Sequence, residues 1–339
     1  MGPWDVVSDS REHAAFGPWV DEVRTPLEVP HLYRDHPLDL RTARLVLKVP
    51  RNITRREAAA EVDLYDHLVV VRTGSLTVLS RHQDARGEPA GRPRGYLTRQ
   101  VALDDVVAVH DEVDLLDGRL HVHTVDGDVV SLSYNGSARG GVQRLVEELR
   151  TGPARPAGPR GPRRADPARP SAPAPRTAPG AGAEEFTVAS LDPGDVADVA
   201  VVADYRQVAR QRPDLVAVAW HGRQVLRPRP TGPAGALRNL THLLSPMTLQ
   251  AALLARDGTH LEVFGRREWL VRGHRPVHSS SRLLLPLRTL ERVRARPNPR
   301  YRRATDVTLQ AGKAHLHLTV PTGSIAERLL RVSATWPSA

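Results

Sequence analysis

The hydrophobic positions of the chain fall mostly into short runs of strand length, separated by glycine and polar breaks. The run from His67 to Val71 is typical of a buried strand, and Ser75 to Leu79 alternates like a strand with one exposed face. Further strands are expected at 96–103, 106–110, 119–124 and 129–134, the last two joined through Asp126-Gly127. The first 150 residues therefore read mainly as β-structure.

A helix is expected at the end of this first set of strands. Apolar residues recur there at i, i+3, i+4 and i+7, at Val142, Leu145, Val146 and Leu149. This spacing places them on one face of an amphipathic helix, which must pack against the strands that precede it.

A second set of elements follows the same order. Strands are expected at 249–255, 260–264, 282–287 and 290–294, and then at 307–310 and 314–320 across Ala311-Gly312. A helix begins at Ser324, where Ser324 and Glu327 have the spacing of a capping box, with Ile325, Leu329 and Val332 facing inward.

The spacing within the two sets also matches. The residues around Gly74 and Gly258 are similar, and each glycine precedes a leucine by 29 residues, at Leu103 and Leu287. Each leucine opens a triplet of apolar residues spaced by threes, which Val106 and Val109 complete in the first set. Such a repeat suggests two copies of one binding fold.

The order of six or seven short strands and then one amphipathic helix resembles the pleckstrin-homology-like (PH-like) fold, in particular its small bacterial members. The resemblance covers residues 67–150 and 248–333 and implies a mainly β fold of two PH-like barrels, each capped by its C-terminal helix. Lipid-binding members of the group carry a basic cluster after the first strand and often a tryptophan in the helix. Thr73-Gly74-Ser75 has no such cluster and neither helix contains tryptophan, so the resemblance does not imply phosphoinositide recognition.

The composition predicts five segments. Residues 151–183 consist almost entirely of Pro, Ala, Gly and Arg and are expected to form a disordered linker. The resemblance implies that residues 1–150 form the first PH-like domain, whose N-terminal extension contains a strand at 43–49 that is expected to complete the sheet. Residues 184–247 contain a helix at 195–212 and a strand at 215–220 and are expected to pack on the second domain, 248–333, which a tail of 334–339 follows.

Several classes of chemistry are excluded by composition. The chain has no cysteine, so disulfides, thiolate metal ligands and a cysteine nucleophile are all excluded. No apolar stretch approaches the roughly 18 residues of a membrane span, and we expect a soluble, cytoplasmic protein.

The formal net charge of +10 is concentrated in two parts of the chain, the linker at 151–183 and the segment 266–303. Residues 1–150 contain 19 basic and 24 acidic residues, whereas 266–303 contain twelve arginines against Glu268 and Glu291. Such a segment attracts phosphates, anionic lipid headgroups or an acidic protein. The residues expected to make these contacts are Arg266, Arg267, Trp269, Arg272, Arg275, Arg300, Arg302 and Arg303.

A second interpretation of the arginine-rich segment stays open. The only lysines are Lys48 and Lys313, and this arginine bias suggests a GC-rich genome. The segment would then be an ordinary solvated surface, or a surface docked on the acidic first domain.

The remaining polar motifs favour structural interpretations. His121 and His123, like His315 and His317, share one face of a strand as in some metal sites, but no third ligand is evident. The acidic residues from Asp104 to Asp117 are expected to form a solvated loop, and the glycine-rich run 135–141 a strand-to-helix turn. No metal or cofactor is expected.

These observations predict a non-catalytic adaptor or scaffold with two PH-like modules, the second carrying an arginine-rich face for an anionic lipid surface or an acidic protein. The alternative is a nucleic-acid-associated protein that uses residues 266–303 together with the linker. Single-strand binders place aromatic residues between basic ones, and this segment offers only Trp269 and Tyr301. An enzyme with a site between the domains is a third possibility, and a contact between the acidic first and basic second domain is also expected.

Overall fold

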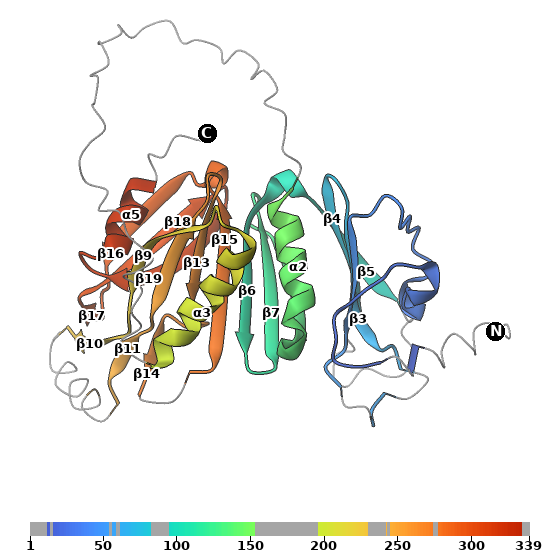
Figure 1. Cartoon of the computed structure of the whole chain (residues 1–339), viewed down its shortest axis with the longest axis horizontal. Coiled ribbons are helices and arrows are strands. Elements are labelled where there is room, and N and C mark those ends of the chain that lie inside the picture. The colour runs from blue at the N-terminus through green and yellow to red at the C-terminus, as the bar shows by residue number, and fades with distance from the viewer. Residues whose placement is uncertain are drawn as a thin grey trace, which may run out of the picture.

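The protein is mainly β, with antiparallel sheets in two halves of the chain (Figure 1). The computed structural model describes residues 12–13, 16–53, 56–58, 62–82, 95–152, 196–229, 242, 245–273 and 277–333. Almost all of the linker expected at 151–183 lies outside the described residues, as does the tail at 334–339.

The first half begins with a five-stranded sheet in the order β1-β2-β3-β4-β5. Its strands are β1 (Asp21–Glu22), β2 (Leu45–Pro50), β3 (Tyr65–Val71), β4 (Ser75–Arg81) and β5 (Tyr96–Ala102). The predicted strand at 43–49 is β2, which joins the first sheet as expected and pairs antiparallel with β3. Both faces of β3 are buried, because the N-terminal segment packs on the outer face through Phe16, Val23 and Tyr33.

Three further strands and a helix complete the first half. They are β6 (Val106–Asp114), β7 (Asp117–Thr124), β8 (Val129–Asn135) and α2 (Arg139–Arg150). The predicted apolar face of the helix, including Val142 and Leu145, is buried against the inner faces of both sheets. Burial of a complete aliphatic side chain contributes about 1.5–3 kcal/mol, so this helix is held mainly by packing.

The second half repeats this order of elements. A four-strand group contains β9 (Val216–His221), β12 (Ala252–Arg256), β13 (His260–Gly265) and β15 (Ser279–Pro286), and a three-stranded sheet contains β16 (Arg292–Pro297), β18 (Ala304–Ala311) and β19 (Ala314–Pro321). Helix α5 (Ile325–Ser333) packs against β9 and β16, as α2 packs against β2 and β6. Short 3-10 turns, Leu103–Asp105 and Leu287–Thr289, lie at the same place in the two halves.

The strand predicted at 249–255 is divided into two. Residues Met247–Leu249 form β11, which pairs with β10 (Gln224–Pro228) and β14 (Leu270–Arg272), whereas β12 pairs with β13 and β9. The chain changes sheet at Gln250, whose backbone amide donates to the carbonyl of Trp269 at 2.9 Å. This hydrogen bond continues the register of the β11–β14 pair by one residue before the chain enters β12, and a hydrophobic pattern does not reveal the change of sheet. The short strand β17 (Tyr301–Arg302) completes the small sheet.

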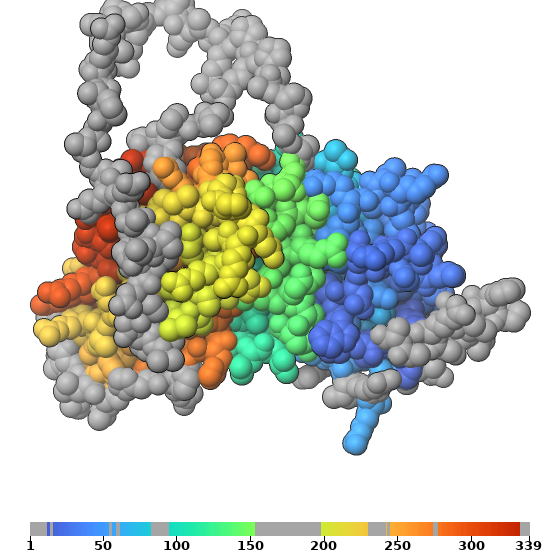
Figure 2. All heavy atoms as spheres, in the orientation of Figure 1, coloured from blue at the N-terminus to red at the C-terminus, as the bar shows by residue number. Residues whose placement is uncertain are grey.

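Helix α3 and strand β9 precede the second half in sequence and are part of its structure. Helix α3 (Val196–Gln211) buries Val201, Val202 and Tyr205 against the outer face of β12 and β13. Figures 1 and 2 show α3 and α2 side by side on one face of the molecule. Arg139 of α2 and Asp204 of α3 form an ion pair there at 3.5 Å.

The two halves share one continuous sheet, with the strand order β8-β7-β6-β15-β13-β12-β9. Strand β15 pairs antiparallel with β6, from Ser279 opposite Asp114 to Leu284 opposite Val109. Among the described residues neither half closes into a barrel, because β5 pairs only with β4 and β16 pairs only with β18. Each half is instead a pair of packed sheets with a helix at one end.

A second contact joins the hairpin turns of the two halves. The amide of Lys313 donates to the carbonyl of Val125 at 2.8 Å, and Gly312 lies directly beneath that carbonyl. Gly312 has φ of 59°, in the left-handed region, and a Cβ there would stand 2.4 Å from the carbonyl oxygen. Glycine is therefore required both by the backbone conformation and by the close approach.

We expect Gly312→Ala to lower the free energy of unfolding by at least about 1–3 kcal/mol, the usual cost of a left-handed non-glycine residue. Chemical denaturation of the full chain measures this loss. Gly258→Ala is the matched control, since no atom lies within 4 Å of a Cβ at that turn. Equal stability of the two variants would contradict the close contact between the hairpin turns.

Candidate functional site

The twelve arginines of residues 266–303 have different environments in the folded chain. Arg266 and Arg282 are buried, with 5% and 4% of their surface exposed. Arg292, Arg294 and Arg296 are exposed on β16, and Arg300, Arg302 and Arg303 are exposed beyond it. These groups must be considered separately, because a buried and paired guanidinium is not available to a partner.

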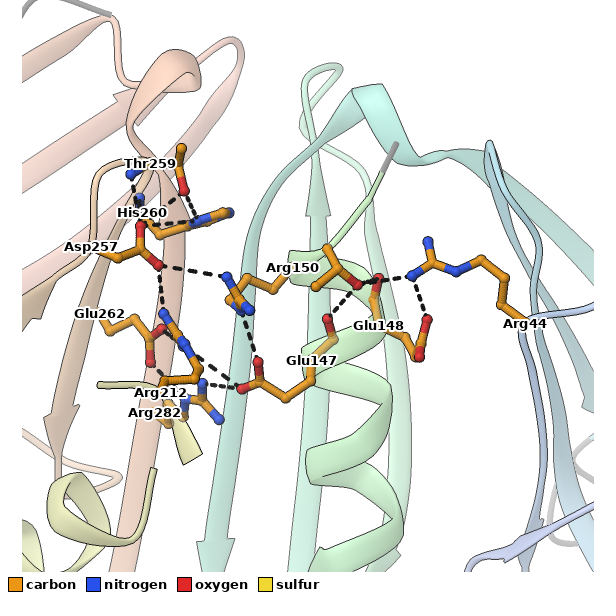
Figure 3. A network of polar contacts seen from close by, with 11 residues as sticks. Arg44, Glu147, Glu148, Arg150, Arg212, Asp257, Thr259, His260, Glu262 and Arg282 are labelled. Atoms are coloured by element: carbon orange, nitrogen blue, oxygen red, sulfur yellow. Dashed lines mark hydrogen bonds and ion pairs between the residues drawn. The ribbon is translucent and has the colours of Figure 1, made fainter. Parts of the chain in front are cut away.

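Arg282, one of the buried arginines, lies at the centre of a charge network where the two halves meet (Figure 3). Arg282 of β15 donates to Glu262 of β13 at 2.9 Å and to Glu147 of α2 at 2.6 Å. Arg212, just after α3, donates to Glu262 and, at 2.5 Å, to Asp257. The network therefore connects an element of the first half to three elements of the second.

The network contains equal numbers of positively and negatively charged groups. The three arginines are Arg150, Arg212 and Arg282, and the three carboxylates are Glu147, Asp257 and Glu262. Burial favours the neutral acid, but the attraction of Arg282 and its hydrogen bond outweigh this effect and hold the pKa of Glu147 below its usual range. Burial is also outweighed at Asp257, where hydrogen bonds from His260 and Thr259 lower the pKa of the carboxyl.

Two of the residues that the sequence singled out make contacts within the chain, one inside the second half and one across the junction. Arg266 donates to the backbone carbonyl of Ser279 at 2.5 Å. Arg267 reaches into the first half, where it pairs with Asp117 at 2.9 Å and with Glu112 at 3.8 Å. Neither guanidinium extends freely into solvent.

The other predicted contact residues are not gathered in one place. Trp269 is half-buried against the core of the second half, and Arg272 is exposed on β14. Arg275 lies outside the described residues. Arg300, Arg302 and Arg303 follow a turn in which the Asn298 side chain accepts hydrogen bonds from the amides of Arg300 and Tyr301, at 2.9 Å each.

The exposed arginines of β16 form a regular row that the sequence analysis did not single out. Val293 and Ala295 pack against the core, so Arg292, Arg294 and Arg296 must point to the opposite side of the strand. The signal was present in the sequence as Arg-Val-Arg-Ala-Arg. Arginines at every second residue, with apolar residues between them, distinguish this row from the other arginines of the segment.

The neighbouring strands add polar side chains to the same surface. Arg294 stands opposite Thr308 of β18, and Thr308 opposite His317 of β19; Arg292 stands opposite Gln310, and Gln310 opposite His315. We call this surface the arginine face: Arg292, Arg294, Arg296, Thr308, Gln310, His315 and His317. A hollow of about 420 Å³ lies on it, lined by residues that include Arg294, Arg296, Thr308 and His315.

Among the described residues, the arginine face has a single carboxylate in its strand register, that of Asp306, which stands opposite Arg296. Asp306 borders the hollow, but its carboxylate accepts hydrogen bonds from Asn298 at 2.9 Å and from Thr319 at 3.1 Å. Within the described parts of the chain, Arg292, Arg294 and Arg296 have no carboxylate within 4 Å, in contrast to Arg267 and Arg282. Guanidinium groups in this state can donate to carboxylates or phosphates of a partner.

The histidines do not form a metal site. Over the residues that the structure describes, no three or more histidines, aspartates and glutamates are placed to hold a metal ion. His121 contacts Ser131 at 2.9 Å, and His110 contacts Ser281 of β15 at 2.7 Å. Burial lowers the pKa of His110 to about 3, so this residue stays neutral at the junction.

The acidic and glycine-rich motifs also have structural roles. Asp111 is buried and accepts hydrogen bonds from Tyr134 at 2.5 Å and Arg139 at 3.3 Å, so it is not a solvated loop residue as predicted. Gly136 and Gly141 allow close approach to the carbonyls of Leu115 and Val20. The run 135–141 is therefore a packed strand-to-helix turn rather than a phosphate cradle.

Removal of one carboxylate from the network tests its importance. Glu262 is 0% exposed and is shared by two arginines, so Glu262→Gln leaves buried positive charge without compensation. We expect a loss of about 3–5 kcal/mol in the free energy of unfolding, measured by urea denaturation at neutral pH. Asp126→Asn is the control, since this carboxylate is exposed and its ion pair with Lys313 spans 3.9 Å. Unchanged stability of Glu262→Gln would show that the network does not hold the halves together.

Comparisons with known proteins assign no family. No family profile, curated protein or solved structure matches this chain. Among the described residues, no helix combines the length and apolar character that crossing a membrane requires. What the protein does must therefore be inferred from the chemistry of its own surface, where the arginine face is the most distinctive feature.

Proposed function

We propose that the protein is a non-catalytic cytoplasmic adaptor, built from two PH-like modules, that binds an acidic protein through the arginine face. The observation that carries this proposal is the row of three exposed arginines without carboxylate partners in the described structure. The repeated order of strands, 3-10 turn and terminal helix supports the PH-like interpretation of the two halves. The absence of cysteine is compatible with a cytoplasmic location.

An acidic protein suits this surface better than a lipid membrane does. Membrane-binding surfaces combine basic residues with exposed apolar or aromatic side chains that enter the interface. The large hydrophobic residues that are exposed in the described chain, such as Trp19, Leu115 and Val225, all lie on elements other than β16, β18 and β19. The arginine face instead combines guanidinium groups with hydroxyl, amide and imidazole groups, which suit a polar partner.

Nucleic acid fits the same surface less well. Proteins that bind single strands stack bases on exposed aromatic side chains. Tyr301 is buried and Trp269 packs against the core, so neither of the aromatic residues in this segment offers such a platform.

We expect the double variant R294E/R296E to bind immobilised poly-glutamate at least about tenfold more weakly than the unaltered chain. Each charge-assisted hydrogen bond contributes about 1.5–3 kcal/mol, and 1.4 kcal/mol corresponds to a factor of ten. Surface plasmon resonance at two or more salt concentrations measures the effect. Anionic vesicles and duplex DNA serve as comparison ligands, and both are expected to bind more weakly than poly-glutamate.

The matched control is R206E/R210E, which makes the same change of charge at exposed positions of α3. This control should retain its affinity within about twofold, apart from the small effect of net charge. Equal losses in both variants would mean that only net charge matters, and unchanged binding of R294E/R296E would overturn the proposal.

A further inference from the structure

Among the described strands, β16 has an unpaired edge at the position where the edge of its counterpart, β6, is paired. In the first half, β6 pairs on one side with β7 and on the other with β15. In the second half, β16 pairs with β18 and, among the described strands, has no partner on its other side. The two strands hold the same position, since each follows a 3-10 turn and precedes the terminal hairpin.

The pairing of β6 shows that a strand at this position of the fold can accept an added strand along its second edge. Strand β15 adds to β6 as an antiparallel strand over six residue pairs. Helix α2 packs against β6 without preventing this, and α5 takes the corresponding place beside β16. The chain thus contains a working example of strand addition at this position of the fold.

Side chains on the outer face of β6 also contact the second half, both on β15 and on the segment that follows β13. His110 contacts Ser281 of β15 at 2.7 Å, and Glu112 pairs with Arg267 at 3.8 Å. Position by position, the offset that relates Leu103 to Leu287 relates His110 to Arg294 and Glu112 to Arg296. Glu112 pairs with Arg267, and the equivalent position in the second half is occupied by Arg296. An acidic residue on β6 is thus replaced by an arginine on β16.

We propose that the open edge of β16 binds an extended acidic segment of a partner protein as an added antiparallel strand. The backbone of the segment continues the sheet, and its carboxylates, at every second residue, face Arg292, Arg294 and Arg296. Pro297 has no amide hydrogen and ends the available edge. This inference rests on the proposed function and adds the chemistry and conformation of the partner.

A second copy of this chain is a poorer occupant. In the first half, the counterpart of β15 is β5. Like β16, β5 lies at the edge of its sheet. In the register of the β6–β15 pair, β5 of another copy would place Arg99 directly opposite Arg294 and Leu97 opposite Arg296. Like charges directly opposite one another destabilise an antiparallel pair, so the arginines guard the edge against self-association.

The test uses the full chain and dye-labelled heptapeptides with both ends blocked. The first peptide is Ser-Glu-Val-Glu-Val-Glu-Ser, and the second, Ser-Val-Glu-Glu-Glu-Val-Ser, has the same composition with adjacent acids. Fluorescence anisotropy should show at least about tenfold tighter binding of the alternating peptide. R292E/R294E/R296E should abolish that binding, whereas R300E/R302E/R303E, with the same change of charge, should reduce it much less.

Backbone methylation separates strand addition from simple attraction of charge. Amides of an added strand point alternately toward and away from the edge, so N-methylation of the glutamate amides and of the valine amides should differ in effect. One of these two peptides should lose binding and the other should keep it. Equal binding of both methylated peptides and of the adjacent-acid peptide would overturn strand addition while leaving the arginine face as an anion-binding surface.

Two further outcomes are decisive. Binding of poly-glutamate or anionic vesicles without binding of the alternating peptide would also overturn strand addition alone, and failure of all these ligands would overturn the proposed function as well. Sedimentation velocity of the free chain should show a monomer. Dimers or longer assemblies that R292E/R294E/R296E removes would identify a second copy as the occupant and contradict the acidic segment.

Discussion

The pairing of β6 with β15 is the contact on which the arrangement of the two halves depends. It converts two separate pairs of sheets into one structure with a continuous seven-stranded sheet. It also brings Glu147 of α2 to Arg282 and Glu262, which are almost completely buried. These charged side chains can be buried only because they pair with one another. Each would carry a large, uncompensated desolvation penalty if its partners were removed.

This junction explains why the arginine-rich segment does not act as a single surface. Arg267 and Arg282 form ion pairs across the junction, and Arg266 donates to the carbonyl of Ser279 within the second half. The arginines of β16 lie on the far side of the second half and have no such partners among the described residues. One stretch of sequence therefore provides both an internal contact and an outward surface.

The two halves use the same strand position in opposite ways. On β6 the edge is filled from within the chain, and outward side chains such as Glu112 contact the neighbouring segment. On β16 no described strand pairs with this edge, and arginines take the outward positions. Proteins commonly protect open edges with charge and proline, and β16 has both. The same protection makes the edge selective, since an acidic strand neutralises the arginines that repel other chains.

Local patterns predicted much of the fold and less of the site. The strand β4, the spacing of Val142 and Leu145 in α2, and the 29-residue spacing of Gly74 and Leu103 are all local and were readable from the sequence. The exposed face expected for β4 was wrong, because residues 76–79 are all buried. The β6–β15 pairing joins residues about 170 positions apart, and no local pattern encodes it.

The environment of each arginine depends on that distant pairing. Arg282 and Arg294 are indistinguishable by residue type, yet one is buried between two carboxylates and the other is exposed. Arg266 was predicted as a contact residue and proved to be buried. The period of two in β16 could have identified the exposed row, because alternation with Val293 and Ala295 shows which side the arginines take.

Hydrogen exchange measured by mass spectrometry tests the central claim most directly, because it compares β6 and β16 in the same molecule. In the free chain, β6 should be protected along both edges, whereas the β16 amides that face away from β18 should exchange rapidly. Addition of the alternating acidic peptide should slow exchange in β16 and leave β6 unchanged. Protection of β16 equal to that of β6 in the free chain, or no change in β16 at saturating peptide, would contradict an open edge that binds an acidic strand.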